Sequence, residues 1–425
     1  MKRNLLIGAA FAVAMIGLVV TERALEQTAA AQARSNVQVP IFEVDPFWPK
    51  TMPNNWVFGM TIGLGIDEKD QVWIIHRGND PGNLDRTEYA FPPPAAPAAD
   101  GGAAAAAAPP AEPPTRVSEC CNPAPPVVAF DQGGNVVHSW GGKTLHPAWP
   151  ESNHGIVVDH KGIVWIGGNG QPDSHSLKFT REGKFVQMFG KPNARIVDGK
   201  FVANSNDMEN FGRVAKIFID PKTNEAYVAD GYFNKRVAVI DMDSGKIKRY
   251  WGAYGNKPDD APLGRYDPKA PLPQQFRTPV HCAELSNDGF VYVCDRPNDR
   301  IQVFTKEGKF VKEKQLFPET LSDGSVWDIA FSRDPQQRFL YVADGANEHV
   351  YIVDRDTLDV VTSFGTGGRQ PGQFFGVHSI AVDSKGNIYT TETYTGKRLQ
   401  KFVFKGMGPP TSDKQGAPWP RRTGG

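Results

Sequence analysis

Short runs of alternating apolar and polar residues, separated by tight turns, dominate the chain. In Thr278–Phe304, one alternating run begins at His281 and a second occupies Phe290–Cys294. Between them lies Asn287-Asp288-Gly289, and Asn/Asp-Gly between two period-two runs is a strong β-hairpin signal. A third run follows after a charged corner, and Lys309–Glu313 supplies a fourth. The segment therefore predicts four consecutive antiparallel strands.

The same hairpin pattern recurs along the chain. Its copies lie at Gly59–His76, His154–Gly167, Val214–Ala229, Thr278–Phe304, Val326–Ala343 and His378–Thr391. Recurrence at such a period indicates a repeat architecture. Six four-stranded units without a helical period predict an all-β, six-bladed β-propeller. A stack of open sheets is the alternative, but it would keep the exposed edges that ring closure removes.

One strand and one insertion complete this picture. The sixth copy has a clear third strand, Leu399–Phe404, and Gln38–Val44 is the candidate for its missing outer strand. We therefore place the propeller at residues 38–404. An insertion at residues 78–126 interrupts the first blade, and its Ala/Pro-rich part, residues 91–114, is expected to be disordered.

Both ends of the chain are expected to lie outside the propeller. Two basic residues precede the apolar run Leu5–Val20, and Ala31-Gln32-Ala33 resembles a cleavage site. Residues 1–33 are therefore predicted to be a signal peptide, with an uncleaved membrane anchor as the alternative. We expect a periplasmic or secreted protein. Residues 405–425 are expected to form a flexible tail.

The charge balance of the chain limits the partners we expect. The sequence holds 47 Lys and Arg against 47 Asp and Glu. No overall field therefore favours nucleic acid or an anionic membrane. We expect no nucleic-acid partner, no membrane contact beyond an N-terminal anchor, and a monomer.

Four cysteines are expected to reside in an oxidising compartment. Cys282 and Cys294 lie symmetrically about the turn of the fourth copy, so they are candidate cross-strand partners. They could form a disulfide or remain two buried thiols. Cys120 and Cys121 are adjacent, and their pairing cannot be read from the sequence.

Three histidines occupy one register position of the repeat. When the copies are aligned on the end of the first strand, His154, His281 and His378 stand five positions earlier in copies two, four and six. Innermost strands line the central channel of a propeller, so histidines from alternate blades would converge on the axis. Three imidazoles with one open position form the ligand set of a catalytic zinc, although imidazole also suits other transition metals. The alternative is that each is an ordinary histidine at the start of a strand.

From about residue 55 to residue 404, the chain resembles the lyase domain of peptidylglycine α-amidating enzymes, a six-bladed propeller of NHL-type repeats. The segments that carry the resemblance are Trp73–Gly78 (WIIHRG), Asn153–Asp159 (NHGIVVD), Asp230–Arg236 (DGYFNKR), Thr278–Leu285, Asp295-Arg296 and Val377–Asp383 (VHSIAVD). These segments look like the arginine, histidine and tyrosine motifs of that family.

The resemblance implies a zinc-dependent carbon–nitrogen lyase. Zinc would be held by the three histidines, Arg77 and Arg296 would engage the substrate carboxylate and the developing charge, and Tyr232 would be the general base. The family's reaction splits a peptidyl-α-hydroxyglycine into a peptide amide and glyoxylate. The implied substrate is therefore a small peptide or another α-hydroxy-amide. A tyrosine would need nearby positive charge to act as a base, because its ordinary pKa is near 10.

The chain also departs from the family pattern. After the third histidine the family has an aspartate that helps bind substrate or an axial calcium, and here that residue is Ser379. Ser379 is thus a candidate substrate-binding residue, and a structural calcium ion is in doubt. The cysteines do not match the family's disulfides, and the insertion after Arg77 is foreign to it.

Two other functions compete with the lyase. One is a non-catalytic NHL-repeat propeller that binds a peptide, a protein or a cell-envelope ligand, which would have no need for histidines in alternate blades. The other is a different propeller enzyme, such as a lactonase or a streptogramin-type lyase. Those sites use acidic residues or other histidine placements, and the sequence shows no matching set of acidic residues.

Overall fold

The computed structural model describes residues 37–78, 83–84, 88 and 119–410. The predicted signal peptide at residues 1–33, the Ala/Pro-rich residues 91–114 and the last part of the predicted tail lie outside these residues. Among the described residues, no helix is long and apolar enough to cross a membrane.

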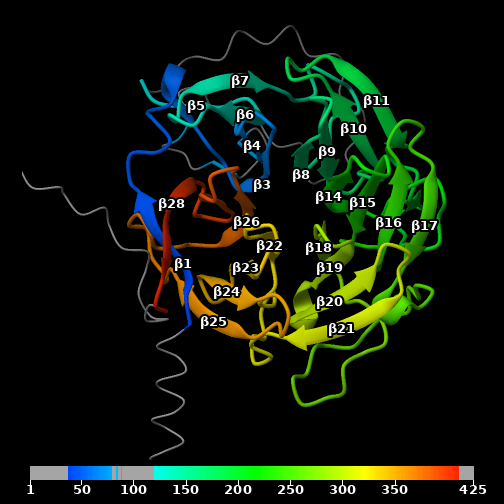
Figure 1. The fold of residues 1–425 in the computed structure, drawn as a ribbon. Helices are drawn as coiled ribbons and strands as arrows, with labels where there is room; N and C mark the ends of the chain where they lie inside the picture. The colour runs from blue at the N-terminus through cyan, green and yellow to red at the C-terminus, as the bar shows by residue number, and fades with distance from the viewer. Residues whose placement is uncertain (1–36, 79–82, 85–87, 89–118, 411–425) are drawn as a thin grey trace, which may run out of the picture.

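Four-stranded antiparallel sheets stand around a central axis (Figure 1). The described part of the chain forms six such sheets, which confirms the predicted all-β, six-bladed propeller. In each sheet the first strand of the hairpin is innermost. The innermost strands in chain order are β3 (Thr61–Ile66), β8 (Asn153–Val158), β14 (Val214–Asp220), β18 (Val280–Leu285), β22 (Asp328–Phe331) and β26 (Val377–Val382).

The remaining strands of each blade follow outward in chain order. Blade one contains β4 (Val72–His76), β6 (Val127–Phe130) and β7 (Val136–Trp140), and blade two contains β9 (Val164–Gly168), β10 (His175–Phe179) and β11 (Phe185–Gly190). Blade three contains β15 (Glu225–Asp230), β16 (Arg236–Asp241) and β17 (Ile247–Trp251), and blade four contains β19 (Phe290–Asp295), β20 (Arg300–Thr305) and β21 (Phe310–Gln315). Blade five contains β23 (Phe339–Asp344), β24 (His349–Asp354) and β25 (Val360–Phe364).

The sixth blade joins the two ends of the described chain. It contains β27 (Ile388–Glu392) and β28 (Leu399–Gly408), and its outer strand is β1 (Val39–Asp45), which pairs antiparallel with β28. The first strand of the propeller thus completes its last sheet, as the strand count predicted. Because β28 pairs with β1 as far as Gly408, residues 405–408 of the expected tail belong to the sheet.

A buried aspartate at the end of the innermost strand closes the hairpin in two successive blades. Asp67 accepts hydrogen bonds from the backbone N–H of Gln71 (2.9 Å) and from Nε1 of Trp73 (3.0 Å). Asp159 accepts the equivalent bond from Nε1 of Trp165 (2.9 Å) in the second blade. The carboxylate therefore satisfies both the turn and the indole N–H of a core residue, which would be costly to leave unpaired.

Buried ion pairs hold the corner between the second and third strands of blades three and four. Nε of Arg236 donates to Asp230 (2.8 Å), and Nε of Arg300 donates to Asp295 (2.7 Å). All four side chains are fully buried. Since a buried charge needs a partner, these pairs set the path of the loops between them.

The described residues contain two disulfides. Cys282 and Cys294 are bonded across β18 and β19, in register, which decides between the two states that the sequence left open. Cys120 and Cys121 are bonded to each other. They precede β5 (Asn122–Pro123), which pairs in parallel with β2 (Trp56–Val57), so the last part of the insertion lies on the propeller.

The loops between the blades contain 3-10 turns and one small hairpin. The turn η4 (Arg296–Asn298) follows β19, and η3 (Ala253–Gly255) follows β17. The hairpin of β12 (Ile196–Val197) and β13 (Lys200–Phe201) lies between blades two and three along the chain.

Candidate metal centre

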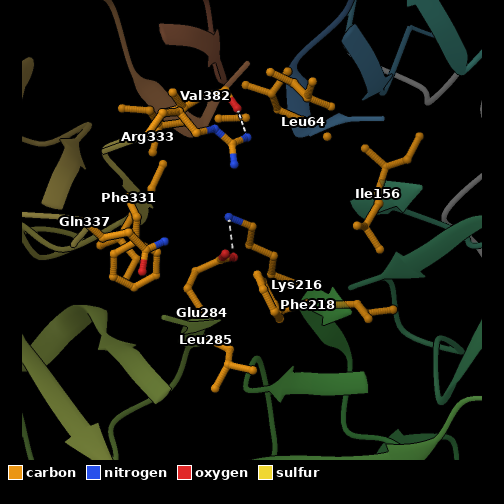
Figure 2. A pocket seen from close by; sticks show the side chains of 18 of the residues that line it. Leu64, Ile156, Lys216, Phe218, Glu284, Leu285, Phe331, Arg333, Gln337 and Val382 are labelled. Atoms are coloured by element: carbon orange, nitrogen blue, oxygen red, sulfur yellow. Dashed lines mark hydrogen bonds and ion pairs between the residues drawn. The ribbon is translucent and has the colours of Figure 1, made fainter. Parts of the chain in front are cut away.

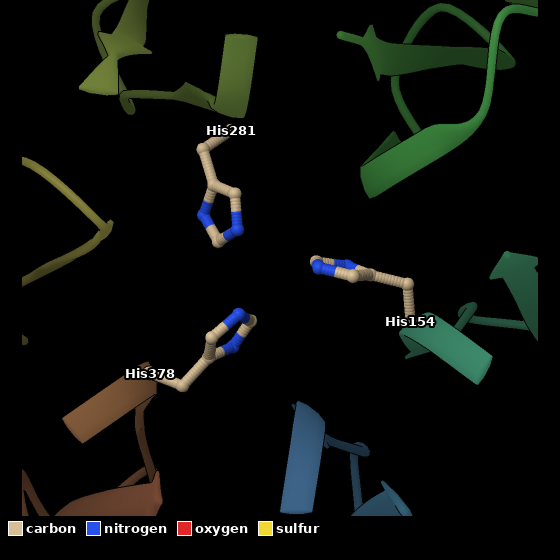
Figure 3. Close-up of side chains that lie close together, drawn as sticks. All are labelled: His154, His281 and His378. Atoms are coloured by element: carbon tan, nitrogen blue, oxygen red, sulfur yellow. The ribbon is translucent and has the colours of Figure 1, made fainter. Parts of the chain in front are cut away.

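Three buried imidazoles meet on the axis of the propeller (Figure 3). His154 lies on β8, His281 on β18 and His378 on β26, so they come from alternate blades. Their available ring nitrogens lie within 4.8 Å of one another. Each residue is 2–3% exposed. In the described part of the chain, this is the group of His, Cys, Asp or Glu side chains close enough to hold an ion.

The intervening blades orient the three rings through backbone carbonyls. Nδ1–H of His154 donates to the carbonyl of Ala215 (2.7 Å), and Nδ1–H of His378 donates to that of Ile62 (2.8 Å). His281 donates to the carbonyl of Trp327 in the same way. Because a carbonyl can only accept, each ring carries its proton on Nδ1 and leaves the lone pair of Nε2 available. This is the arrangement that orients metal-ligating histidines in proteins.

The three rings are neutral. Burial lowers the pKa of His378 to about 3, and it lowers the pKa values of His154 and His281 well below the ordinary value. The positive charge of Arg296 lowers the pKa of all three rings further, and that of Arg77 does so for His154 and His378. A neutral imidazole is the form that ligates a metal, so these rings need not lose a proton to bind one.

Tyr232 joins the histidines from the corner of blade three. Its hydroxyl lies 2.7 Å from Nε2 of His154 and 3.2 Å from Nε2 of His281. Tyr232 follows the buried Asp230, so the ion pair of that corner holds the loop over the axis. Burial raises the pKa of Tyr232, while the positive charges of Arg296 and Arg77 act against that shift.

Arg296 lies beside this group, at the start of η4. Its guanidinium stacks over the ring of Trp327 at 4.5 Å, and its Nη2 is 3.9 Å from a carboxylate oxygen of Asp323. The neighbouring Asp295 is engaged by Arg300 instead. Nε of Arg296 is buried and has no hydrogen-bonding partner among the described residues. An unpaired buried donor at this position could engage an anionic group of a ligand.

Arg77 follows β4 of blade one and is oriented by blade two. Its Nε donates to the carbonyl of Asn153 (3.0 Å), and its Nη2 donates to the side-chain oxygen of Asn169 (2.7 Å). Asn153 precedes the first histidine, so Arg77 is tied to the strand that carries His154. Both predicted arginines and the predicted tyrosine therefore lie at the histidine end of the channel.

Ser379 lies next to the third histidine, and its hydroxyl is 3.3 Å from Nδ1 of His378. It lines a small void of about 10 Å³ beneath the rings, together with Lys216 and Asp328. Nζ of Lys216 contacts Asp328 (2.6 Å) and Glu284 (2.9 Å). One ammonium is already paired with both of these carboxylates, and Ser379 adds no charge. The donor set therefore does not fit calcium at this position.

Sequence analysis missed the residues that support the site. In blades one, three and five, the positions equivalent to the histidines are Ile62, Ala215 and Trp327. Each contributes a backbone carbonyl, which the identity of the side chain does not predict. Lys216 could have been noticed because the innermost strand β14 is apolar from Val214 to Ile219 apart from this lysine.

No family model matches the chain. Among curated proteins, it is similar to peptidyl-glycine alpha-amidating monooxygenase B of Xenopus laevis, at 23% identity over 363 residues, which cover 83% of this chain and 34% of that protein. The chain thus spans about a third of the length of such relatives. It is also similar to a probable peptidyl-alpha-hydroxyglycine alpha-amidating lyase of Caenorhabditis elegans, at 22% identity, covering 58% of this chain and 63% of that protein.

A third relative carries the repeat in its name. NHL repeat-containing protein 3 of Mus musculus is 25% identical and covers 66% of this chain and 73% of its own length. Among solved structures, a streptogramin B lyase is 12% identical with a TM-score of 0.47, covering 86% of this chain and 98% of that one. The similarity to amidating lyases and NHL-repeat proteins agrees with the resemblance carried by the motifs.

Proposed function

We propose that this protein is a metal-dependent lyase that cleaves the N–C bond of a peptidyl-α-hydroxyglycine or a closely related α-hydroxy-amide. The observation that carries the proposal is the group of three neutral, buried imidazoles with the Tyr232 hydroxyl in contact with two of them. The similarity to proteins named as peptidyl-alpha-hydroxyglycine alpha-amidating lyases supports the same reaction class. Three nitrogen ligands with an open position favour zinc.

The chain's own residues can divide the work of such a reaction. Arg77 and Arg296 hold the substrate carboxylate, since a guanidinium grips a carboxylate through paired N–H donors. Oη of Tyr232 accepts the proton of the substrate hydroxyl, and this proton ends on the departing amide nitrogen. The C–N bond breaks as the hydroxyl-bearing carbon becomes the aldehyde of glyoxylate, so no water is consumed.

A metal held by His154, His281 and His378 would act as a Lewis acid on the substrate oxygens and would stabilise the ionised form of Tyr232. Burial of Tyr232 otherwise favours its neutral form. The two arginines supply further positive charge at the same end of the channel. Together these charges provide what a tyrosine base requires.

We further propose that the protein works outside the cytoplasm, in the periplasm or as a secreted protein. The N-terminal pattern predicts export, and the described residues contain two disulfides, which persist in oxidising compartments.

The test is glyoxylate release from a short peptidyl-α-hydroxyglycine by zinc-loaded protein. We expect release well above the spontaneous rate, its loss on chelation, and its recovery when zinc is returned. The control is the His281→Ala variant purified in parallel. A protein that contains stoichiometric metal yet releases no glyoxylate from this substrate or its α-hydroxy-amide analogues would contradict the proposal. A folded protein that binds no metal would favour a non-catalytic NHL-repeat propeller.

A further inference from the structure

A second cavity lies on the axis, at the end of the channel opposite the histidines (Figure 2). Its volume is about 240 Å³, several times the roughly 30 Å³ that one water occupies in the liquid. All six innermost strands line it. We call it the far cavity. The small void beneath the imidazoles shares Leu64, Ile156 and Lys216 with it, so the two follow one another along the axis.

A layer of ion-paired side chains separates the far cavity from the metal centre. Nζ of Lys216 is bonded to Glu284 on the cavity side and to Asp328 on the side of the small void. The void above it holds only about 10 Å³. A ligand larger than a water molecule in the far cavity would therefore not reach the histidines. A ligand bound in the far cavity would therefore take no part in the proposed lyase reaction.

Two hydrogen-bond donors converge on the far cavity from one side. Arg333 donates from Nε to the carbonyl of Asp383 (3.0 Å) and from Nη2 to that of Val382, and these bonds fix its guanidinium across the mouth. Its Nη1 has no hydrogen-bonding partner among the described residues. The side-chain oxygen of Gln337 accepts the N–H of Asn287 (2.7 Å), which turns Nε2 of Gln337 away from that bond. Figure 2 shows both side chains directed into the cavity.

The remaining walls of the far cavity are mostly apolar. They include Leu64, Ile156, Phe218, Leu285 and Phe331. A small apolar pocket with a few converging polar groups is the usual form of a site for a small organic molecule. Lys216 is already paired with Glu284 and Asp328, so the donors that remain for a ligand are those of Arg333 and Gln337. The polar group of a ligand that contacts these donors must therefore be an acceptor, and a carboxylate is the acceptor that a guanidinium binds most strongly.

We propose that the far cavity binds a small monocarboxylate with a short branched or aromatic apolar body. The carboxylate accepts hydrogen bonds from Nη1 of Arg333 and Nε2 of Gln337, and the apolar body lies against Phe218 and Ile156. A planar carboxylate suits this pair of donors better than a spherical anion, because one of its oxygens can accept from Arg333 and the other from Gln337. Arg333 is exposed at the rim, so a ligand can enter without opening the propeller.

The experiment is calorimetric titration of metal-depleted protein with 3-methylbutanoate and with benzoate. Metal depletion matters because a carboxylate could also bind a metal ion at the histidines. The neutral amides of the same acids serve as isosteric ligand controls. We expect saturable binding of at least one acid and at least tenfold weaker binding of its amide. The absence of saturable binding by either acid up to about 10 mM would overturn the proposal.

Two variants locate the binding. Arg333→Gln removes the charge at the mouth, and Gln337→Glu keeps the acceptor for Asn287 N–H while replacing the donor with a negative charge. We expect each to weaken carboxylate binding at least tenfold, while Arg338→Gln, an exposed arginine on the same hairpin, leaves it unchanged. Undiminished binding in Gln337→Glu would overturn the proposal even if Arg333→Gln failed to fold. Binding that His378→Ala abolishes and both cavity variants retain would assign the ligand to the metal centre and would equally overturn it.

Discussion

Two layers of polar groups along the axial channel differ in how far they are paired within the protein. At the histidine end, Nε of Arg296 has no hydrogen-bonding partner in the described part of the chain, and Nε2 of His154 and of His281 meets only the Tyr232 hydroxyl. Below them, Lys216 is already bonded to two carboxylates. The polar groups at the histidine end can therefore bind a ligand, whereas those of the Lys216 layer are already bonded to one another.

This difference indicates that the histidine end is built for binding and the Lys216 layer for structure. Buried polar groups are normally satisfied, and unsatisfied ones concentrate where a ligand completes them. If the comparison is correct, substitutions at the histidine end should affect metal and activity more than folding. Substitutions in the Lys216 layer should do the reverse.

The largest effect is expected from His281→Ala. Loss of one of three ligands should abolish tight metal binding and lower glyoxylate release by about 10⁴-fold, because the site then lacks its Lewis acid. Metal content by atomic emission and the initial rate of release measure the two effects. His349→Ala, which replaces a histidine outside the site, should alter neither. Retention of stoichiometric metal in His281→Ala would contradict the comparison.

Tyr232→Phe should lower the rate by about 10²–10⁴-fold while metal content stays unchanged, since general-base catalysis contributes on that order. The measurement is kcat at saturating substrate, together with metal analysis of the same sample. Tyr250→Phe is the matched control, because its hydroxyl bonds to Asn206 away from the axis. A Tyr232→Phe variant with the wild-type rate would mean that the hydroxyl only orients the neighbouring imidazole rings and is not the base.

Lys216→Met should destabilise the fold by about 3–5 kcal/mol, because it leaves two buried carboxylates without their counter-ion. Chemical denaturation measures the change. The triple variant Lys216→Met, Glu284→Gln, Asp328→Asn should recover much of the loss, since it removes the uncompensated charges. Equal instability of the single and triple variants would show that packing, not charge, sets the effect.

The penalty of Lys216→Met should also depend on pH. Burial already raises the pKa of Glu284 to about 7 in the presence of Lys216. Removing the ammonium raises it further, so the folded state binds more protons than the unfolded state above pH 4.5. Stability of the variant should therefore fall as pH rises from about 5 to 8. A denaturation series across that range tests this sign. The triple variant is the reference, because it retains the other buried carboxyls that titrate there, such as Asp299 and Glu392.

The smallest effect is expected from opening the Cys282–Cys294 disulfide. It closes a short loop beside His281, so the Cys282→Ala, Cys294→Ala variant should lose about 2–3 kcal/mol of stability with little change in kcat. Thermal unfolding and kinetics on the folded variant measure these quantities. A large loss of kcat would mean that the disulfide also sets the position of the imidazole.

The repeat of the sequence determined the fold, the closure of the ring and the placement of the three histidines. Alternating runs define strands directly, and equal register in alternate blades forces His154, His281 and His378 to one depth. The strand count also predicted that an N-terminal strand, observed as Val39–Asp45, completes the last blade. Each of these features is a local pattern that recurs from blade to blade, so the sequence alone predicts it.

The tertiary structure alone decided what surrounds those histidines. The carbonyls of Ile62, Ala215 and Trp327 orient the rings, and a backbone acceptor is the same for every residue type. The disulfide state and the ion pairs of Lys216 depend on which strands become neighbours across the axis. Alternation along one strand says which face a side chain occupies. What it meets there is set by strands far away in the sequence, and only their packing decides it.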